Sequence, residues 1–228
     1  TFTASNYSIT YTNGTLTVGT AALTITANNG SKTYGQTFTT GAGSANFTSS
    51  GLLNSETIGS ITIASTGALS TAAVGSYNIV PSAATGGTFT ASNYSITYTN
   101  GTLTVNAATP TVTVTVGTYT YNGTAQGPTA ATNTGTGTSY TFSYVGTGGT
   151  TYAASSTLPT NAGTYTATAT VAANGNFGSA SSSATAFTIG VATPTVTVTV
   201  GTYTYTGTAQ GPTAATNTGT GTSYTFSY

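Results

Sequence analysis

Lys32 and Glu56 are the only side chains in this chain that carry a formal charge. A buried lysine can attack an asparagine amide while a carboxylate transfers the protons, which forms an intramolecular isopeptide bond. The alternative is two independent surface charges that contribute little to stability. We favour the alternative because the related second half of the chain aligns Tyr119 with Lys32 and contains no acid at all.

The residue types that most catalytic and metal sites need are missing. The sequence contains no His, Cys, Met or Trp, and its single acidic residue is a glutamate. This excludes general acid/base pairs, Ser/His/Asp and Cys/His nucleophiles, zinc sites and calcium loops of the EF-hand kind. We therefore predict that the chain is not an enzyme and has no catalytic, cofactor-binding or metal-binding residues.

The charge balance also limits the partners. A formal net charge of +0 gives no basic surface for nucleic acid or anionic lipid. No run of about 18 apolar residues predicts insertion into a membrane. Because so little charge repulsion opposes contact between copies, we expect the main partner to be the chain itself, as a homopolymer or through lateral filament contacts.

The chain repeats itself at the scale of domains. Residues 1–18 recur unchanged as 88–105, and residues 108–144 recur as 192–228 with one change, Asn122 to Thr206. Repeats of this period decide the architecture before local patterns do. We therefore divide the chain into a C-terminal fragment of a type A repeat (1–18), a complete type A repeat (19–106, module A), a complete type B repeat (107–191, module B) and an N-terminal fragment of type B (192–228), and we expect it to be part of something longer.

Both modules show the alternation of β-strands. Thr111–Val116 alternates threonine with valine, and Gly163–Val171 places Tyr165 and three small apolar residues on one face. No segment has a helical period. Asn100-Gly101 predicts either a two-residue hairpin that pairs Tyr98 with Leu103, or a bulge in one long final strand. Phe177 to Ile189, the counterpart in module B, slightly favours the long strand because it has no comparable turn.

The two modules align as distant copies of one fold. Gly75-Ser76-Tyr77 matches Gly163-Thr164-Tyr165, and Leu103-Thr104-Val105 matches Phe187-Thr188-Ile189. A tyrosine two residues after glycine on a late strand predicts a tyrosine corner, in which the hydroxyl bonds to upstream backbone. About seven short strands per module predict an all-β protein of tandem immunoglobulin-like β-sandwich domains arranged end to end, although the cysteine pair and core tryptophan of antibody domains are absent.

Module A resembles a known repeat family. The segments Ser31–Gly35 (SKTYG), Gly51–Ser60 (GLLNSETIGS), Val74–Ser82 (VGSYNIVPS) and Ala91–Val105 are similar to the MBG/YDG-type repeats of very large bacterial surface proteins, including filamentous-haemagglutinin-like adhesins. Module B, through Thr118–Thr129 and Asn161–Thr170, is similar to related bacterial Ig-like repeats. The resemblance implies an extracellular location at the cell surface or in a secreted filament, and a structural role without site residues.

From these observations we expect a non-catalytic structural segment of a long extracellular bacterial filament or adhesin stalk. The alternative is an adhesive module that binds glycans or another host or environmental surface through exposed tyrosines. The tyrosines in question are Tyr119, Tyr140, Tyr144 and Tyr152. Two further hypotheses are ice binding by ordered rows of threonine and glycosylation of the Asn-x-Ser/Thr triplets. β-Propensity already explains the threonines, and the preference of Asn-Gly for turns explains asparagines in such triplets.

Overall fold

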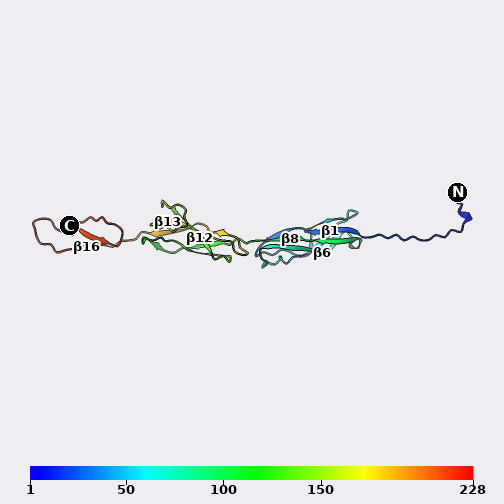
Figure 1. Ribbon diagram of the computed structural model, residues 1–228, viewed down its shortest axis with the longest axis horizontal. Coiled ribbons are helices and arrows are strands. Elements are labelled where there is room, and N and C mark those ends of the chain that lie inside the picture. The colour runs from blue at the N-terminus through cyan, green and yellow to red at the C-terminus, as the bar shows by residue number, and fades with distance from the viewer. Residues whose placement is uncertain (228) are drawn as a thin grey trace. The chain divides into compact units, whose positions relative to one another are not determined.

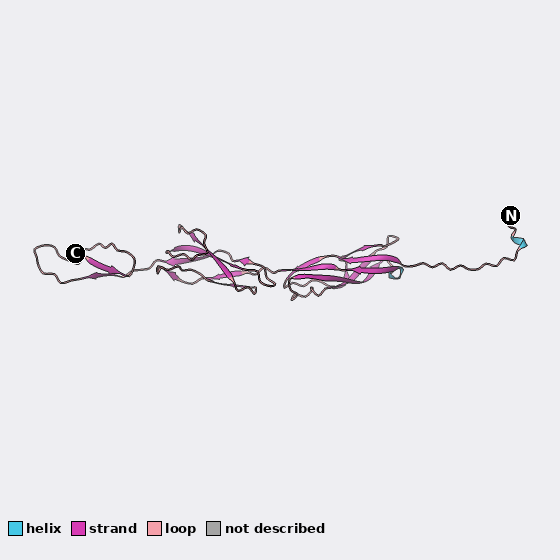
Figure 2. Cartoon of the chain, viewed as in Figure 1, coloured by secondary structure: helices cyan, strands magenta, loops and turns pink. Residues whose placement is uncertain are grey.

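The computed structural model describes residues 1–227, and its regular secondary structure is almost entirely β-strand (Figure 1, Figure 2). The only helical segments among these residues are two three-residue 3-10 turns, η1 (Ala4–Asn6) and η2 (Ala91–Asn93). The predicted all-β class is therefore confirmed. The chain divides into two compact units, Thr1–Ala108 and Thr109–Tyr228, and each sheet takes its strands from one unit only.

The first unit contains two sheets. A three-stranded sheet has the order β4-β1-β7, and a five-stranded sheet has the order β2-β8-β6-β5-β3. The strands are β1 (Ala21–Ala27), β2 (Gly30–Thr33), β3 (Gly41–Ser44), β4 (Phe47–Ser50), β5 (Ile58–Ala64), β6 (Gly75–Gly87), β7 (Tyr94–Thr99) and β8 (Gly101–Asn106).

The core of this unit joins its two sheets. Leu23 and Ile25 of β1 lie in one buried cluster with Ile61 of β5, Ile79 of β6 and Leu103 of β8. These are alternate positions on their strands, as expected when one face of each sheet is removed from water. The apolar alternation of module A thus produces two sheets that share one core.

The first two strands of this unit, β1 and β2, pair in parallel with the last two, β7 and β8. Each pair of consecutive strands passes from the three-stranded sheet to the five-stranded sheet. β1 pairs with β7, from Ala21 opposite Tyr94 onward, and β2 pairs with β8, from Gly30 opposite Leu103 onward. The chain therefore enters the unit at one end and leaves it at the opposite end.

This crossing overturns the predicted hairpin at Asn100-Gly101. β7 and β8 do not pair with each other; they belong to different sheets, and Asn100 is the step between them. A Cβ on Gly101 would lie 2.5 Å from the backbone oxygen of Ala27, so glycine is needed for close strand approach and not for a turn. The continuous final strand is the better description for module A.

Module B, within the second unit, follows the same plan with seven strands, β9 to β15, in place of eight. Its five-stranded sheet has the order β10-β15-β13-β12, with β14 beside β13, and β9 pairs with β11 in a separate two-stranded sheet. The strands are β9 (Val112–Thr115), β10 (Tyr119–Thr120), β11 (Ala130–Asn133), β12 (Tyr140–Thr147), β13 (Gly163–Val171), β14 (Ala180–Ser181) and β15 (Thr185–Gly190). Phe177 to Ile189 is thus not the single strand that we inferred.

The core of the second unit is aromatic. Tyr144, Tyr165 and Phe187 form one buried cluster with the β9 valines Val112 and Val114, so both sheets contribute to it. The rings of Tyr165 and Phe187 are stacked with centroids 5.4 Å apart, and those of Tyr144 and Phe187 meet edge to face at 6.2 Å. Such aromatic pairs stabilise the core beyond the area that they bury.

Strand register confirms the alignment of the two modules. In β6 and β8, Tyr77 lies opposite Leu103, and in β13 and β15, Tyr165 lies opposite Phe187. On the other edge of the last strand, Lys32 is opposite Val105 and Tyr119 is opposite Ile189. Lys32 and Tyr119 therefore occupy equivalent positions, as the sequence alignment indicates.

Residues 192–227 repeat the opening hairpin of module B. β16 (Val196–Thr199) pairs with β17 (Ala214–Asn217) in the same register as β9 with β11, shifted by the repeat length. Val196 and Val198 are 55% and 43% exposed, whereas Val112 and Val114 are 6% and 5% exposed. Among the described residues, β16 and β17 form a sheet of two strands alone, and no strand like β13 or β15 packs on these valines.

Candidate functional site

Glu56 accepts a hydrogen bond from a buried tyrosine. The Tyr94 hydroxyl donates to Glu56 Oε2 at 2.6 Å and accepts from the Leu53 N–H at 3.0 Å. Between them, Asn54 and Ser55 have left-handed backbone, with φ of 55° and 58°. Conformations of this kind are unfavourable for residues other than glycine and persist where surrounding contacts hold them. The hydrogen bond to the Glu56 carboxylate raises the pKa of Tyr94, and burial adds to the shift.

Sequence reasoning missed this Tyr94–Glu56 bond. Tyr94 is 38 residues from Glu56, and no local pattern joins the two. The sequence offered one signal: its only side-chain carboxylate must either accept hydrogen bonds from nearby donors or face water.

Lys32 is buried without an acidic partner. It is 6% exposed, and its ammonium donates to the carbonyl oxygens of Gln36, at 2.9 Å, and Leu69. These bonds join β2 to two loops at the exit end of the unit. The two carbonyl oxygens accept from two of the three N–H donors of the ammonium, but its charge has no counter-ion among the described residues.

The isopeptide hypothesis is wrong on this geometry. Glu56 is held at Tyr94, opposite the first residue of β1, whereas Lys32 lies opposite Val105 near the end of the last strand. At about 3.3 Å per residue, the eleven positions from Ala21 to Lys32 correspond to roughly 36 Å of extended chain. The two charges therefore lie near opposite ends of the unit. The alternative of two surface charges is also corrected, because Lys32 is buried.

Both predicted tyrosine corners are present. Tyr77 donates to the Ala73 carbonyl oxygen at 2.8 Å, and Tyr165 donates to that of Asn161 at 2.7 Å. In each case the acceptor lies four residues upstream of the tyrosine. Burial raises the pKa of Tyr165, and the neighbouring Tyr152 adds to the shift. The corners tie the entrance of β6 and of β13 to the loop before it.

The exposed tyrosine platform is not found. Tyr144 is only 2% exposed, and its hydroxyl donates to the Pro128 carbonyl oxygen at 2.7 Å. Burial also raises its pKa. Tyr119, Tyr140 and Tyr152 are half-buried against the same core. Tyr140, Phe142 and Tyr144 occupy alternate positions on β12 and face the core, while Tyr119 and Tyr152 pack against the same core from β10 and from a loop.

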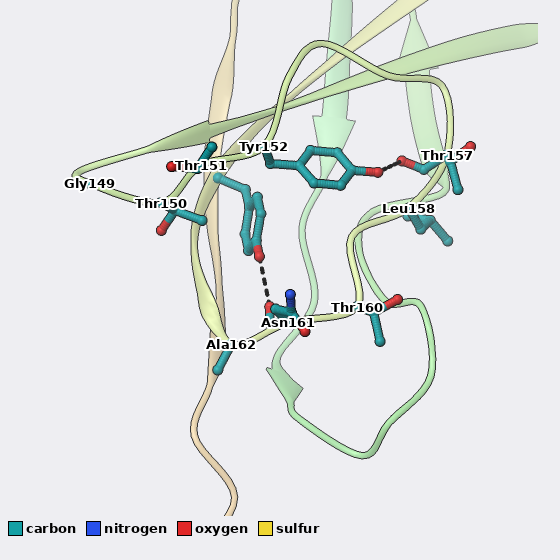
Figure 3. A pocket seen from close by; sticks show the side chains of 10 residues that line it. Gly149, Thr150, Thr151, Tyr152, Thr157, Leu158, Thr160, Asn161 and Ala162 are labelled. Atoms are coloured by element: carbon teal, nitrogen blue, oxygen red, sulfur yellow. Dashed lines mark hydrogen bonds between the residues drawn. The ribbon is translucent and has the colours of Figure 1, made fainter.

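One groove of the second unit gathers polar side chains around Tyr152 (Figure 3). Its volume is about 580 Å³. Its lining contains no charged residue and consists of Gly149, Thr150, Thr151, Tyr152, Thr157, Leu158, Thr160, Asn161, Ala162 and Tyr165.

Both tyrosine hydroxyls of the groove donate to backbone within it, Tyr152 to Thr157 at 2.7 Å and Tyr165 to Asn161 (Figure 3). The rings of Tyr152 and Tyr165 meet edge to face at 5.9 Å. Threonine hydroxyls and one half-buried ring suit a neutral ligand and supply no acid, base or nucleophile activated by a base.

The described residues contain no group of three or more metal-ligating side chains. No helix in the described part of the chain is long and apolar enough to cross a membrane. The two units therefore present ordered hydrogen bonds at their ends and, around Tyr152, a groove without charged side chains.

These features define an all-β chain of two compact units, each with its own buried core. Residues 23–104 match the family described as MBG domain (YGX type). This match confirms that module A resembles the MBG/YDG-type repeats of bacterial surface proteins, and the Tyr34-Gly35-Gln36 segment of module A is a Tyr-Gly-X tripeptide. Neither curated proteins nor solved structures give a match to this chain.

Proposed function

We propose that this chain is a structural segment of a long extracellular bacterial filament or adhesin stalk, built from tandem immunoglobulin-like sandwiches. The observation that carries the proposal is the parallel pairing of first and last strands. Six register pairs join β1 to β7 and four join β2 to β8. A tensile load applied at the two ends of the module acts along these strands and loads their hydrogen bonds together, in shear.

Module B supports the same role with a smaller terminal ladder. Two register pairs, Tyr119 with Ile189 and Thr120 with Gly190, join β10 to β15, and the Tyr121 N–H extends them by donating to the Gly190 oxygen at 2.8 Å. In module A the equivalent Tyr34 N–H donates to the Asn106 oxygen, also at 2.8 Å. In both modules, the pairing between the first and last strands thus ends with an equivalent backbone hydrogen bond.

Electron microscopy of the native cells tests this role. An antibody raised against module A should label long surface or shed filaments at many points along their length. Label confined to filament tips would contradict a stalk, and label confined to the cytoplasm would contradict an extracellular role. Filaments made by copies of this chain would also support the self-association expected from its low charge.

A second candidate function is glycan binding at the groove around Tyr152. The specific observation that favours it is the uncharged lining of threonine hydroxyls beside an aromatic ring, since neutral sugars combine hydroxyl groups with apolar ring faces. A glycan array with the whole chain, compared with a Tyr152→Ala variant, separates the two functions. Binding that the variant loses supports an adhesive module, and an array without signal leaves the stalk role.

A further inference from the structure

We propose that Asn122 is a self-modifying site, at which the loop formed by Tyr121–Gln126 promotes deamidation of the asparagine side chain. Asn122 precedes Gly123, and an Asn-Gly pair allows the glycine nitrogen to attack the side-chain amide with little steric hindrance. The sequence has five Asn-Gly pairs, at Asn13, Asn29, Asn100, Asn122 and Asn174. The surroundings of Asn122 distinguish it from the others.

Three donors converge on the Asn122 amide oxygen. Oδ1 accepts from the Thr124 N–H at 3.0 Å, from Thr124 Oγ1 at 2.7 Å and from Gln126 Nε2 at 2.6 Å. Attack on the amide carbon places negative charge on this oxygen. Hydrogen bonds to a charged acceptor are roughly twice as strong as those to a neutral one, so donors that stay with this oxygen as it becomes an oxyanion stabilise the intermediate more than the intact amide.

The donors are held in place before any reaction. Gln126 Nε2 also donates to the Thr120 oxygen at 2.8 Å, and the Gln126 N–H donates to the oxygen of buried Pro159 at 2.8 Å. Gly123 has φ of 79°, and open space surrounds the position where its Cβ would lie. The loop therefore combines a preorganised cradle for the oxygen with room for a five-membered ring at an exposed position.

The reaction needs only water. The Gly123 nitrogen bonds to Asn122 Cγ and loses its proton, the tetrahedral intermediate expels ammonia, and a succinimide remains. Water then opens the ring at either carbonyl and leaves an aspartate or isoaspartate at position 122. The net change is the exchange of one amide for one carboxylate with release of ammonia, which adds a negative charge to a chain whose only acid is Glu56.

Among the described residues, the other four Asn-Gly pairs lack this cradle. At Asn174 the side-chain amide acts as a donor, from Nδ2 to the Thr136 oxygen at 3.1 Å. Asn29 Oδ1 accepts one bond, from the Thr102 N–H at 2.8 Å. Gly101, after Asn100, is held in β8 against the backbone oxygens of Ala27 and Asn28. Asn13 lies in a stretch without helix or strand, so it serves as an internal reference for an unstructured pair. The second copy of the loop has Thr206 in place of Asn122 and cannot react.

The test is mass spectrometric peptide mapping of the whole chain during incubation at neutral pH, with and without denaturant. We expect Asn122 to convert faster than Asn13 and Asn29 in the folded chain and to lose this advantage in denaturant. Loss of one oxyanion donor costs about 10²–10³-fold in buried enzyme sites, so at this exposed loop we expect Gln126→Ala and Thr124→Val to slow conversion by about threefold to tenfold.

The variants need a structural control. Near-ultraviolet circular dichroism establishes that each variant remains folded, and Asn122→Thr, which copies the second repeat, provides the unreactive reference map. If a variant unfolds, the deamidation rates of Asn122 and Asn13 in the unaltered chain still test the proposal. Slower conversion at Asn122 than at Asn13, or rates that folded donor variants leave unchanged, would overturn the proposal.

Discussion

The hydroxyl of Tyr94 lies 2.6 Å from Glu56 Oε2, so the only carboxylate side chain of the protein is bound by the first residue of β7. The same hydroxyl accepts the Leu53 N–H and thereby closes a loop that contains two left-handed residues. A charged acceptor makes the tyrosine bond stronger than one between neutral groups. The loop conformation therefore depends on one side chain at the entry end of module A.

Removal of this hydroxyl should loosen the loop. In a Tyr94→Phe variant, the Leu53 N–H loses its acceptor and Glu56 loses its donor, so we expect a melting temperature lower by several degrees and faster hydrogen exchange at Leu53. Glu56→Gln keeps an acceptor for the hydroxyl and should have a smaller effect. Hydrogen exchange followed by NMR measures both, and unchanged protection of Leu53 in Tyr94→Phe would contradict this role.

Alkaline pH should destabilise both units. The pKa values of Tyr94, Tyr144 and Tyr165 are raised, the first mainly by its bond to Glu56 and the other two mainly by burial. A pKa raised by folding contributes stability that is complete below the unfolded value of about 10 and is lost as the pH rises through the folded value.

The free energy of unfolding should therefore change little from about pH 7 to about pH 9 and fall above about pH 10. Guanidinium titrations at each pH, together with tyrosinate absorbance, measure this. Stability that persists while all tyrosines ionise would contradict the assignment.

The tyrosine corners provide a matched pair of substitutions. Tyr165→Phe removes the bond to Asn161 at a site that is 1% exposed, whereas Tyr77→Phe removes the bond to Ala73 at a half-buried site. Loss of one such bond costs about 1 kcal/mol, and more where the freed carbonyl stays out of water. We expect the larger loss for Tyr165→Phe in denaturant titrations. A larger loss for Tyr77→Phe would show that burial does not set the cost.

The sequence predicted the features that follow from local pattern. Gly-x-Tyr identified both corners, and alternation identified the bounds of Gly163–Val171. It did not predict that Asn100 steps between sheets, because the parallel β1–β7 and β2–β8 pairing is non-local and overrides the turn preference of Asn-Gly. Alternation also leaves the inner face undetermined, which is why buried Tyr144 was assigned to a surface platform.

Chelator should leave the protein unchanged. Calcium needs about six to eight oxygen ligands, usually from several carboxylates. The chain has one, and it is hydrogen-bonded to Tyr94. We expect the same melting temperature with excess calcium and with a calcium chelator, measured by calorimetry on matched samples. A marked decrease in chelator would reveal an oxygen-ligand site that uses backbone and amide groups.

Single-molecule force spectroscopy of the chain, pulled by its two ends, tests the stalk account most directly. Unfolding one module of about 85 residues at about 3.6 Å per residue should lengthen the tether by roughly 270 Å, after subtraction of a folded length of about 35 Å. Module A has the longer parallel terminal ladder, with six and four register pairs against two in module B, so the account predicts two discrete events with module A unfolding at the higher force. A smooth extension without force peaks, or a module A that yields before module B, would contradict it.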